Sequence, residues 1–371
     1  MQVCCELCGR KEEYVIARWR CDCGGAWTLI PSRSFQSDLI EKDVHSIWRY
    51  RSFFPAEIAA LRESLGAGLT PLLPCTIDDR VVCLKLDFLN PTGSFKDRGV
   101  ELMMNALAAA RVEQIVEDSS GNAGASVAAY AARLGMKASI FAPQHASPAK
   151  LAQIAMYGAA IHTIPGSRLN ASQAAFEAVG RGVVFASHAW NPLYLLGQQT
   201  AAWELWEQND HRAPDWVVVP VGQGGNLLGY FEGFRLLLAA GFIQKLPGLI
   251  AVQPQRLAPI CDAFEQGWKE WVEVCSPSVP SVAEGLAITR PVRWRHIVRA
   301  IKESGGFCVK VPEEDIIPAQ RWLAERGFYV EPTSAVVMAA YQRITKIVER
   351  NQSVVFSLTG NGLKANPASM R

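Results

Sequence analysis

The chain has 371 residues, of which 49% are hydrophobic, and its formal net charge is only +2. A chain of this length and composition can bury more than one hydrophobic core, so we expect two or more globular units. The balanced charge argues against nucleic acid or a membrane surface as a partner, and we find neither a membrane-spanning run nor a signal-peptide pattern. We therefore expect a cytoplasmic protein.

The N-terminus contains two closely spaced cysteine pairs, each followed by glycine. Cys5 and Cys8 form the first pair, and Cys21 and Cys23 form the second. This arrangement is typical of a tetrahedral thiolate site, and we predict that the four cysteines hold a structural zinc ion. Cys4 could take the place of Cys5. The alternative is a segment that has lost its metal and keeps free thiols.

From residue 81 onward, short β-branched runs alternate with longer helical runs. Strands are expected at 81–86, 115–116, 137–141, 160–164, 183–186, 216–221, 249–252 and 353–358. Helices are expected at 100–110, 123–134, 147–157, 169–179, 195–207, 227–238, 313–326 and 333–350. Residues 260–310 are less regular. The alternation predicts parallel sheets covered by helices.

A turn and a helix start surround Lys96. The turn formers Asn90 and Gly93 come first, and Ser94 and Asp97 are predicted to form a capping box that opens the helix. Lys96 then lies in the first helical turn, where the helix dipole disfavours a cation. That position is less unfavourable for a lysine that becomes a neutral or delocalised imine. A solvated surface lysine is the alternative.

Three more polar turns follow predicted strands, where open parallel sheets bind their ligands. Ser119–Gly124 opens a helix, and its backbone N–H groups could hold a carboxylate. Gly222–Asn226 is a glycine-rich nest suited to a phosphate, although it has neither the Walker pattern nor the spacing of a dinucleotide fingerprint. Thr359–Gly362 follows the last strand. Taken alone, each is most simply a tight turn.

Together the four turns supply the groups that one cofactor needs. They offer a lysine for an imine, a nest for a phosphate, an asparagine for a ring oxygen and a hydroxyl for a ring nitrogen. These are the requirements of pyridoxal 5′-phosphate, which stabilises carbanions by acting as an electron sink. The sequence therefore predicts a pyridoxal-phosphate enzyme.

The same turns resemble motifs of the tryptophan synthase β-subunit superfamily of pyridoxal-phosphate enzymes, and most closely those of threonine synthases. The similar segments are Pro91–Arg98, Ser119–Asn122, Pro220–Asn226 and Ser357–Lys364. The cysteine-rich start is similar to the ribbon found on some threonine synthases.

The resemblance implies a role for each motif residue. Lys96 would be the Schiff-base lysine and catalytic base, Asn122 would meet the ring hydroxyl, and Thr359 would meet the ring nitrogen. The phosphate would be held by Gly222, Gln223, Gly224, Gly225 and Asn226. The substrate carboxylate would be held by Ser119, Ser120, Gly121 and Ala123.

The fold class that we expect is α/β, with two open parallel-sheet domains, the cofactor between them and an N-terminal zinc-ribbon-like segment. The ribbon would comprise residues 1–30. The large cofactor domain would comprise residues 31–96 and 191–371, with a smaller mobile domain inserted at 97–190. We also expect a homodimer.

The chain departs from threonine synthases in the segment that grips the substrate phosphate. Tyr194 stands in place of the family arginine, Leu196 in place of a glutamate and Gln199 in place of a lysine. Because tyrosine cannot replace a cationic fork, these changes argue against O-phosphohomoserine as substrate. Arg168 could supply a substitute charge. The segment Ala283–Leu286 resembles serine/threonine dehydratases more than threonine synthases.

The leading hypothesis is an elimination or replacement enzyme, a lyase or synthase, that acts on a small β-substituted amino acid. A true threonine synthase with a rearranged phosphate pocket is the alternative within enzymes. A binding or scaffold protein that has lost turnover is the alternative outside them, and the intact Lys96, Asn122 and Thr359 argue against it.

Overall fold

The computed structural model describes residues 1–60, 63–144, 146, 148–180 and 182–365. It contains two compact units. One comprises Met1–Leu69 and Asn90–Thr200, and the other comprises Thr70–Leu89 and Ala201–Arg371. In the described residues, no helix combines the length and the apolar character needed to cross a bilayer.

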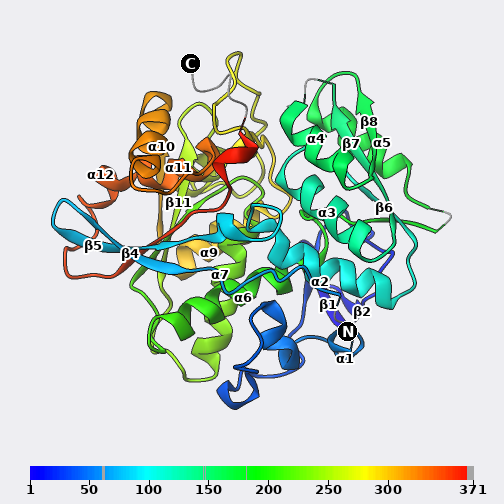
Figure 1. Cartoon of the computed structure of the whole chain (residues 1–371), viewed down its shortest axis with the longest axis horizontal. Coiled ribbons are helices and arrows are strands. Elements are labelled where there is room, and N and C mark those ends of the chain that lie inside the picture. The colour runs from blue at the N-terminus through cyan, green and yellow to red at the C-terminus, as the bar shows by residue number, and fades with distance from the viewer. Residues whose placement is uncertain (61–62, 145, 147, 181, 366–371) are drawn as a thin grey trace. The chain divides into compact units, whose positions relative to one another are not determined.

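The first unit is built on a four-stranded parallel sheet (Figure 1). The strand order is β8-β7-β6-β9, with bounds Ala160–Ile164, Lys137–Pro143, Gln114–Glu117 and Val183–Phe185. Helices of this unit include α2 (Lys96–Ala109), α3 (Asn122–Arg133), α4 (Pro148–Met156) and α5 (Arg168–Glu177). Helices α3 and α5 pack on β7, and α4 packs on β8. Ser147, the first residue of the helix predicted at 147–157, lies outside the described residues.

The N-terminal ribbon is a three-stranded antiparallel sheet in the order β2-β1-β3, and it belongs to the first unit. The strand bounds are Lys11–Glu13, Gln2–Cys5 and Trp27–Leu29. Trp19 anchors the ribbon to the rest of the unit. Its ring stacks on Phe176 of α5 at 4.7 Å and meets Phe185 of β9 edge-on at 5.3 Å.

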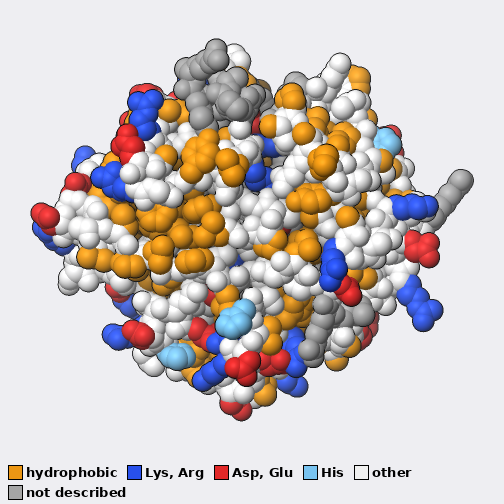
Figure 2. Space-filling model, viewed as in Figure 1, with side chains coloured by type: hydrophobic (Ala, Val, Ile, Leu, Met, Phe, Trp, Pro, Cys, Tyr) orange, Lys and Arg blue, Asp and Glu red, His pale blue; other side chains and the backbone are white. Residues whose placement is uncertain are grey.

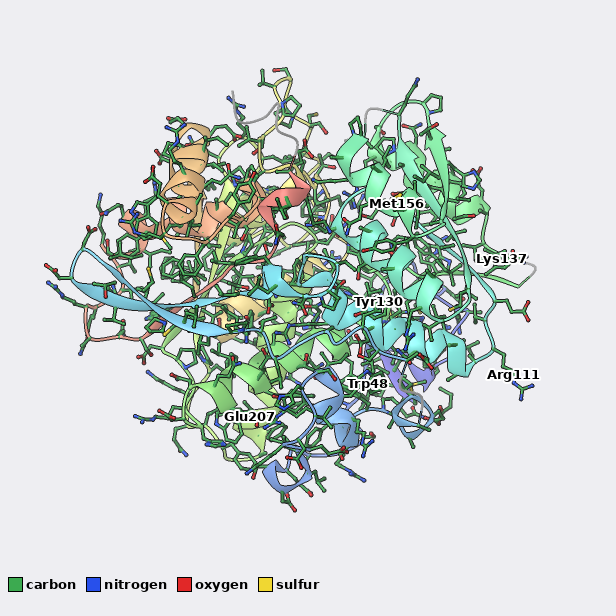
Figure 3. The ribbon with its side chains drawn as sticks, viewed as in Figure 1. Trp48, Arg111, Tyr130, Lys137, Met156 and Glu207 are labelled. Atoms are coloured by element: carbon green, nitrogen blue, oxygen red, sulfur yellow. The ribbon has the colours of Figure 1, made fainter. Side chains whose placement is uncertain are left out.

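The aromatic arm that follows the ribbon packs on α2. It includes the 3-10 segment Ile47–Phe53 and the short helix α1 (Ala56–Ala59). Trp48 Nε1 and Tyr130 OH, both labelled in Figure 3, donate to the buried carboxylate of Glu101. This packing groups residues 31–69 with the first unit, whereas the sequence analysis assigned them to the large domain.

The second unit is built on a six-stranded sheet in the order β12-β11-β10-β13-β5-β4. The strand bounds are Phe307–Val311, Gly248–Pro254, Trp216–Pro220, Val354–Ser357, Arg80–Lys85 and Leu72–Ile77. The sheet is parallel except for β4, which pairs antiparallel with β5. Figure 2 shows hydrophobic side chains gathered over this hairpin, where Leu73 and Val81 are exposed.

Helices α7, α8, α9 and α11 pack on this sheet. Helix α6 (Pro192–Gln208) begins in the first unit and ends in the second. The other helix bounds are Gly225–Ala239 for α7, Pro259–Gln266 for α8, Trp294–Glu303 for α9, Ile316–Ala324 for α10, Pro332–Ala339 for α11 and Tyr341–Ile344 for α12. The core between sheet and helices includes Leu84, Val218, Ile250, Val336 and Phe356.

The predicted parallel α/β architecture is confirmed, and each predicted strand is present to within a few residues. The structure adds detail in three places. Residues 260–310 contain most of α8, all of α9 and the start of β12. The predicted helix at 333–350 is two short helices. Strand β4 and the ribbon strands were not predicted, because short half-exposed strands give little periodicity.

Candidate active site

Lys96 is the first residue of α2, directly after the turn that the sequence predicts. The capping box of Ser94 and Asp97 is wrong, because the helix has no side-chain cap of that kind. Asp97 instead accepts hydrogen bonds from Thr92 N at 2.7 Å, Thr92 Oγ1 at 2.6 Å and Ser126 Oγ at 2.5 Å. The buried Asp97 thus ties the turn to α3 and fixes where Lys96 emerges.

The side chain of Lys96 is half-buried between two aromatic rings of its own unit. Its Nζ lies 4.5 Å from the ring centroid of Phe95 and 5.9 Å from that of Tyr194. Tyr194 is fully buried and sits against Gly99 on the next turn of α2, where an added Cβ would come within 2.4 Å of the ring. The residue at the family's arginine position therefore does lie beside Lys96.

The predicted carboxylate loop connects β6 to α3 in the same unit. Asn122 is the first residue of α3, so the N–H groups of its first turn lack partners within the helix. Gly124 is required by the tight turn, because a Cβ there would come within 1.8 Å of the carbonyl oxygen of Ser119. Ser119 Oγ accepts from Gly121 N at 3.3 Å. The loop presents an anion-binding helix start.

The predicted phosphate loop connects β10 to α7 in the second unit. Gly224 has φ +79°, a conformation that favours glycine, and a Cβ there would come within 2.2 Å of Ile297. A Cβ at Gly222 would come within 2.8 Å of the carbonyl oxygen of Gly285. Only residues without side chains fit at these two positions, which leaves the backbone N–H groups at the start of α7 to meet an anion.

Thr359 follows β13, the strand next to β10, so it leaves the sheet at the same edge as the phosphate loop. The two segments are linked, since Ser357 Oγ donates to Asn226 Oδ1 at 3.2 Å. The backbone of Thr359 is fixed in turn, because Thr359 N donates to Ser334 Oγ at 2.8 Å. The second unit therefore brings the predicted phosphate and ring-nitrogen groups to one sheet edge.

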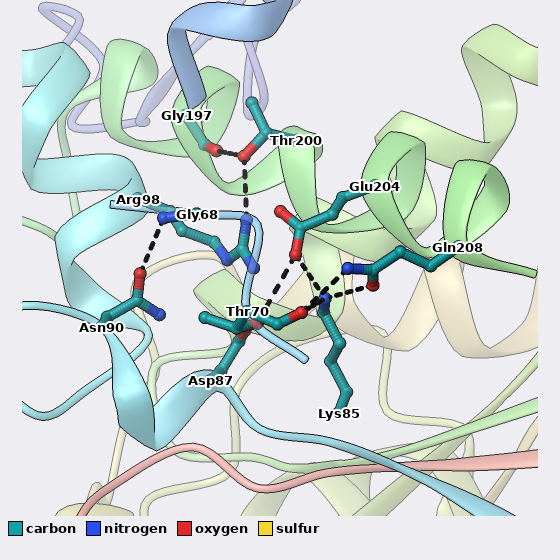
Figure 4. A network of polar contacts seen from close by, with 10 residues as sticks. All are labelled: Gly68, Thr70, Lys85, Asp87, Asn90, Arg98, Gly197, Thr200, Glu204 and Gln208. Atoms are coloured by element: carbon teal, nitrogen blue, oxygen red, sulfur yellow. Dashed lines mark hydrogen bonds and ion pairs between the residues drawn. The ribbon is translucent and has the colours of Figure 1, made fainter. Parts of the chain in front are cut away.

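A second buried lysine, Lys85 at the end of β5, is held in an ion-pair network (Figure 4). Its Nζ pairs with Glu204, and it donates to Thr70 O at 2.6 Å and to Gln208 Oε1 at 2.7 Å. With its donors engaged and both charged groups fully buried, Lys85 is a structural residue and a poor candidate for an imine.

Three ionisable residues that the sequence analysis did not single out lie near Lys96 in the first unit. Glu117 ends β6, Asp118 follows it, and His188 lies in the loop after the neighbouring strand β9. Their ligand atoms lie within 4.8 Å of one another, and His188 Nδ1 is 2.7 Å from Glu117 Oε1. Adjacent strand ends bring together residues that are far apart in the sequence. A short sequence motif cannot reveal such a contact.

Burial sets the protonation of this pair. Burial raises the pKa of Glu117 well above its ordinary value, with a further contribution from the charge of Asp118. Burial lowers the pKa of His188 well below its ordinary value, as do the charges of Lys96 and Arg168. The favoured state is a protonated glutamic acid beside a neutral imidazole.

The ribbon brings four cysteine sulfurs together. The Sγ atoms of Cys5, Cys8, Cys21 and Cys23 lie within 4.8 Å of one another, with Cys5–Cys23 at 3.4 Å and Cys8–Cys21 at 3.8 Å. In a tetrahedral site with Zn–S bonds of about 2.3 Å, the sulfurs are about 3.8 Å apart. Cys4 lies outside the cluster and donates to Gly9 O, so Cys5 is the geometrically suited ligand.

Comparison with known proteins identifies the family. Residues 63–360 match the family model described as "Pyridoxal-phosphate dependent enzyme". The chain therefore belongs to the family of pyridoxal-phosphate dependent enzymes, as the sequence motifs predicted. It is an enzyme of amino-acid metabolism in the lyase and synthase group.

Individual relatives are named for two reactions. The threonine synthase of Methanocaldococcus jannaschii is 31% identical over 382 residues, which cover 99% of this chain and 94% of the relative. The threonine synthase of Synechocystis sp. is 34% identical over 323 residues, which cover 85% and 82%. The crystal structure of a threonine deaminase from T.th. matches with a TM-score of 0.66 and 27% identity, covering 79% of this chain and 92% of that one.

Proposed function

We propose that this chain eliminates or replaces the β-substituent of a small polar amino acid such as serine, threonine or diaminopropionate. Pyridoxal 5′-phosphate would be held by Lys96, Asn122, the Gly222–Asn226 loop and Thr359. The structural support is that each unit assembles its share of these groups at a helix start or a strand end, where the backbone favours an anion or a ligand.

The residues of the chain have distinct roles in this proposal. Lys96 attaches the cofactor and then moves the α-proton of the substrate. The N–H groups of the Ser119–Ala123 loop bind the substrate carboxylate. The hydroxyl of Thr359 would face the ring nitrogen of the cofactor, and a neutral partner there would favour elimination over transamination. When bound, the cofactor supplies the electron sink that stabilises the α-carbanion.

The choice of substrate rests on one observation, which is the surroundings of Tyr194. This side chain is fully buried beside Lys96, and its pKa is raised by burial first and then by the charges of Glu117 and Asp97. A dianionic phosphate would meet carboxyl groups and a neutral phenol there instead of an arginine. The charges of Lys96 and Arg168 act on Glu117. No arginine stands at the position of Tyr194, however, and a buried dianion with too few cationic partners is disfavoured. A small neutral β-substituent fits these surroundings better.

A second candidate function, threonine synthase acting on O-phosphohomoserine, is favoured by Arg168. Arg168 is the first residue of α5, and its positive charge influences the pKa of both Glu117 and His188. This charge is the one that could serve a substrate phosphate in place of the family arginine. The first candidate is preferred, because the position of the family arginine is taken by the neutral, buried Tyr194.

Covalent labelling tests the proposed site. Reduction of the cofactor-loaded protein with borohydride, followed by peptide mapping, is expected to place the label on Lys96. Label on Lys85, or a protein that takes up no cofactor, would contradict the proposal. A comparison of serine, threonine, diaminopropionate and O-phosphohomoserine, with keto acid, ammonia and phosphate all measured, identifies the reaction.

We also propose that the ribbon holds a structural zinc ion on Cys5, Cys8, Cys21 and Cys23. The sulfur geometry and the all-thiolate donor set support zinc, and four protein ligands leave no open position for chemistry. The cytoplasmic location and the homodimer stay predictions.

A further inference from the structure

Glu117 and His188 form a buried polar pair that the roles assigned so far do not use. Glu117 is completely buried and His188 is 5% exposed. One carboxylate oxygen, Oε1, contacts His188 Nδ1 at 2.7 Å, whereas the other, Oε2, has no hydrogen-bond partner among the described residues. Buried polar atoms are normally satisfied, so an unpartnered oxygen indicates a missing group.

The pair and the reacting lysine share a neighbour. Tyr194 is a common neighbour, with its ring 6.0 Å from that of His188 and 5.9 Å from Lys96 Nζ. The pair also lies at the carboxyl ends of β6 and β9, the sheet edge from which the Ser119–Ala123 loop emerges. A substrate whose carboxylate is bound by that loop would have its side chain close to the pair.

A metal ion is a poor occupant. Glu117, Asp118 and His188 could offer three ligand atoms, but the charges of Lys96 and Arg168 act on the same residues. Two nearby cations oppose a third, and a protonated carboxyl is a hydrogen-bond donor, not a metal ligand.

We propose that Glu117 Oε2 is the proton donor to the leaving group of the substrate, with His188 holding the carboxyl in place through Nδ1–H to Oε1. This inference rests on the proposed function. Lys96 takes the α-proton, the bond from the β-carbon to the hydroxyl oxygen breaks, and its electron pair stays on the oxygen. That oxygen takes the proton of Glu117 and leaves as water, so the substrate loses one water in total.

The surroundings of Glu117 favour its protonated form. The ionisable groups that influence it are Asp118 on the same strand end, Lys96 from α2 and Arg168 from α5. His188 faces it from the loop after β9 and Tyr194 from the start of α6. Burial and Asp118 raise its pKa and the two cations lower it, with burial the largest effect.

The test compares two leaving groups, because a hydroxide needs a proton and a chloride does not. Elimination from L-serine, L-threonine and β-chloro-L-alanine is measured as keto acid formed. We expect Glu117→Gln to slow elimination from the hydroxy amino acids by about 10²-fold or more. The rate with β-chloro-L-alanine should stay close to that of the wild-type protein, and borohydride should still label Lys96.

Glu101→Gln is the matched control, since it makes the same change at another buried carboxyl of the first unit that is bonded by Trp48 and Tyr130. It should change all three rates alike. Equal loss with all three substrates in Glu117→Gln would overturn the proposal and leave a positioning role. A wild-type protein that eliminates chloride but not water would also overturn it.

The wild-type protein supplies a second measurement in case Glu117→Gln fails to fold. Glu117 acts in its protonated form, so the rate with L-serine should fall as pH rises through the pKa of Glu117. The rate with β-chloro-L-alanine should show no such fall. Identical pH profiles for the two substrates would overturn the proposal, whereas absence of label on Lys96 would refute the proposed function instead.

Discussion

The phosphate loop of the second unit and the surroundings of Lys96 in the first unit are built in different ways. The proposed phosphate loop is defined by backbone, because Gly222 and Gly224 leave no room for side chains and the N–H groups at the helix start would bind the phosphate. The surroundings of Lys96 are defined by the side chains of Tyr194, Glu117 and His188. A site built from backbone groups retains its ligand when side chains change. A site built from side chains can acquire a different substrate without a change of fold.

The largest expected effect lies at Lys96, the residue to which the proposed function assigns both the cofactor and the α-proton. Lys96→Ala should lower turnover by about 10³-fold or more, because it removes both the covalent attachment and the proton carrier. The measurement is keto acid formation under saturating cofactor. Lys137→Ala, at an exposed lysine of the first unit, is the control and should retain activity. Similar rates for the two variants would contradict the role of Lys96.

The backbone character of the phosphate loop is tested by Gly224→Ala. The change forces a side chain into a left-handed conformation and into Ile297, which should displace the loop. Loss of one or more hydrogen bonds to a charged group, about 1.5–3 kcal/mol, should weaken cofactor binding by roughly 10- to 100-fold. Spectrophotometric titration with the cofactor measures this.

Gly241→Ala is the matched control, since Gly241 has φ +78° in the same unit but nothing within 4 Å of an added Cβ. Gly241→Ala should lower the stability of the folded protein only by the cost of an alanine at positive φ. It should leave cofactor affinity unchanged. If both variants weaken cofactor binding equally, the phosphate loop has no special role.

The sequence predicted the backbone-defined region better than the side-chain-defined one. The glycines of 222–226 and the helix start after them are local signals, and the structure has the same strand, loop and helix there. The bonds of Asp97 to Thr92 and Ser126 could not be predicted, since Ser126 is on another helix. The contact of Glu117 with His188 depends on neighbouring strand ends, and no local pattern encodes it.

The smallest expected effect on turnover concerns the ribbon, which lies outside both regions. Cys21→Ser/Cys23→Ser should abolish binding of one zinc per chain, because two of four thiolate ligands are lost. Metal analysis measures this, and Cys4→Ser is the control because Cys4 lies outside the cluster. Equal zinc content in the double variant and the wild-type protein would reject the site.

We propose that the side-chain surroundings of Lys96 decide the substrate, and steady-state kinetics with O-phosphohomoserine test this most directly. Tyr194 stands where threonine synthases carry an arginine, and loss of one charged hydrogen-bond partner costs about 1.5–3 kcal/mol, or roughly one to two decades in efficiency. We predict that kcat/KM is higher for serine, threonine or diaminopropionate than for O-phosphohomoserine. Formation of threonine from O-phosphohomoserine with kcat/KM above about 10⁴ M⁻¹s⁻¹, the low end of ordinary enzymes, would contradict this.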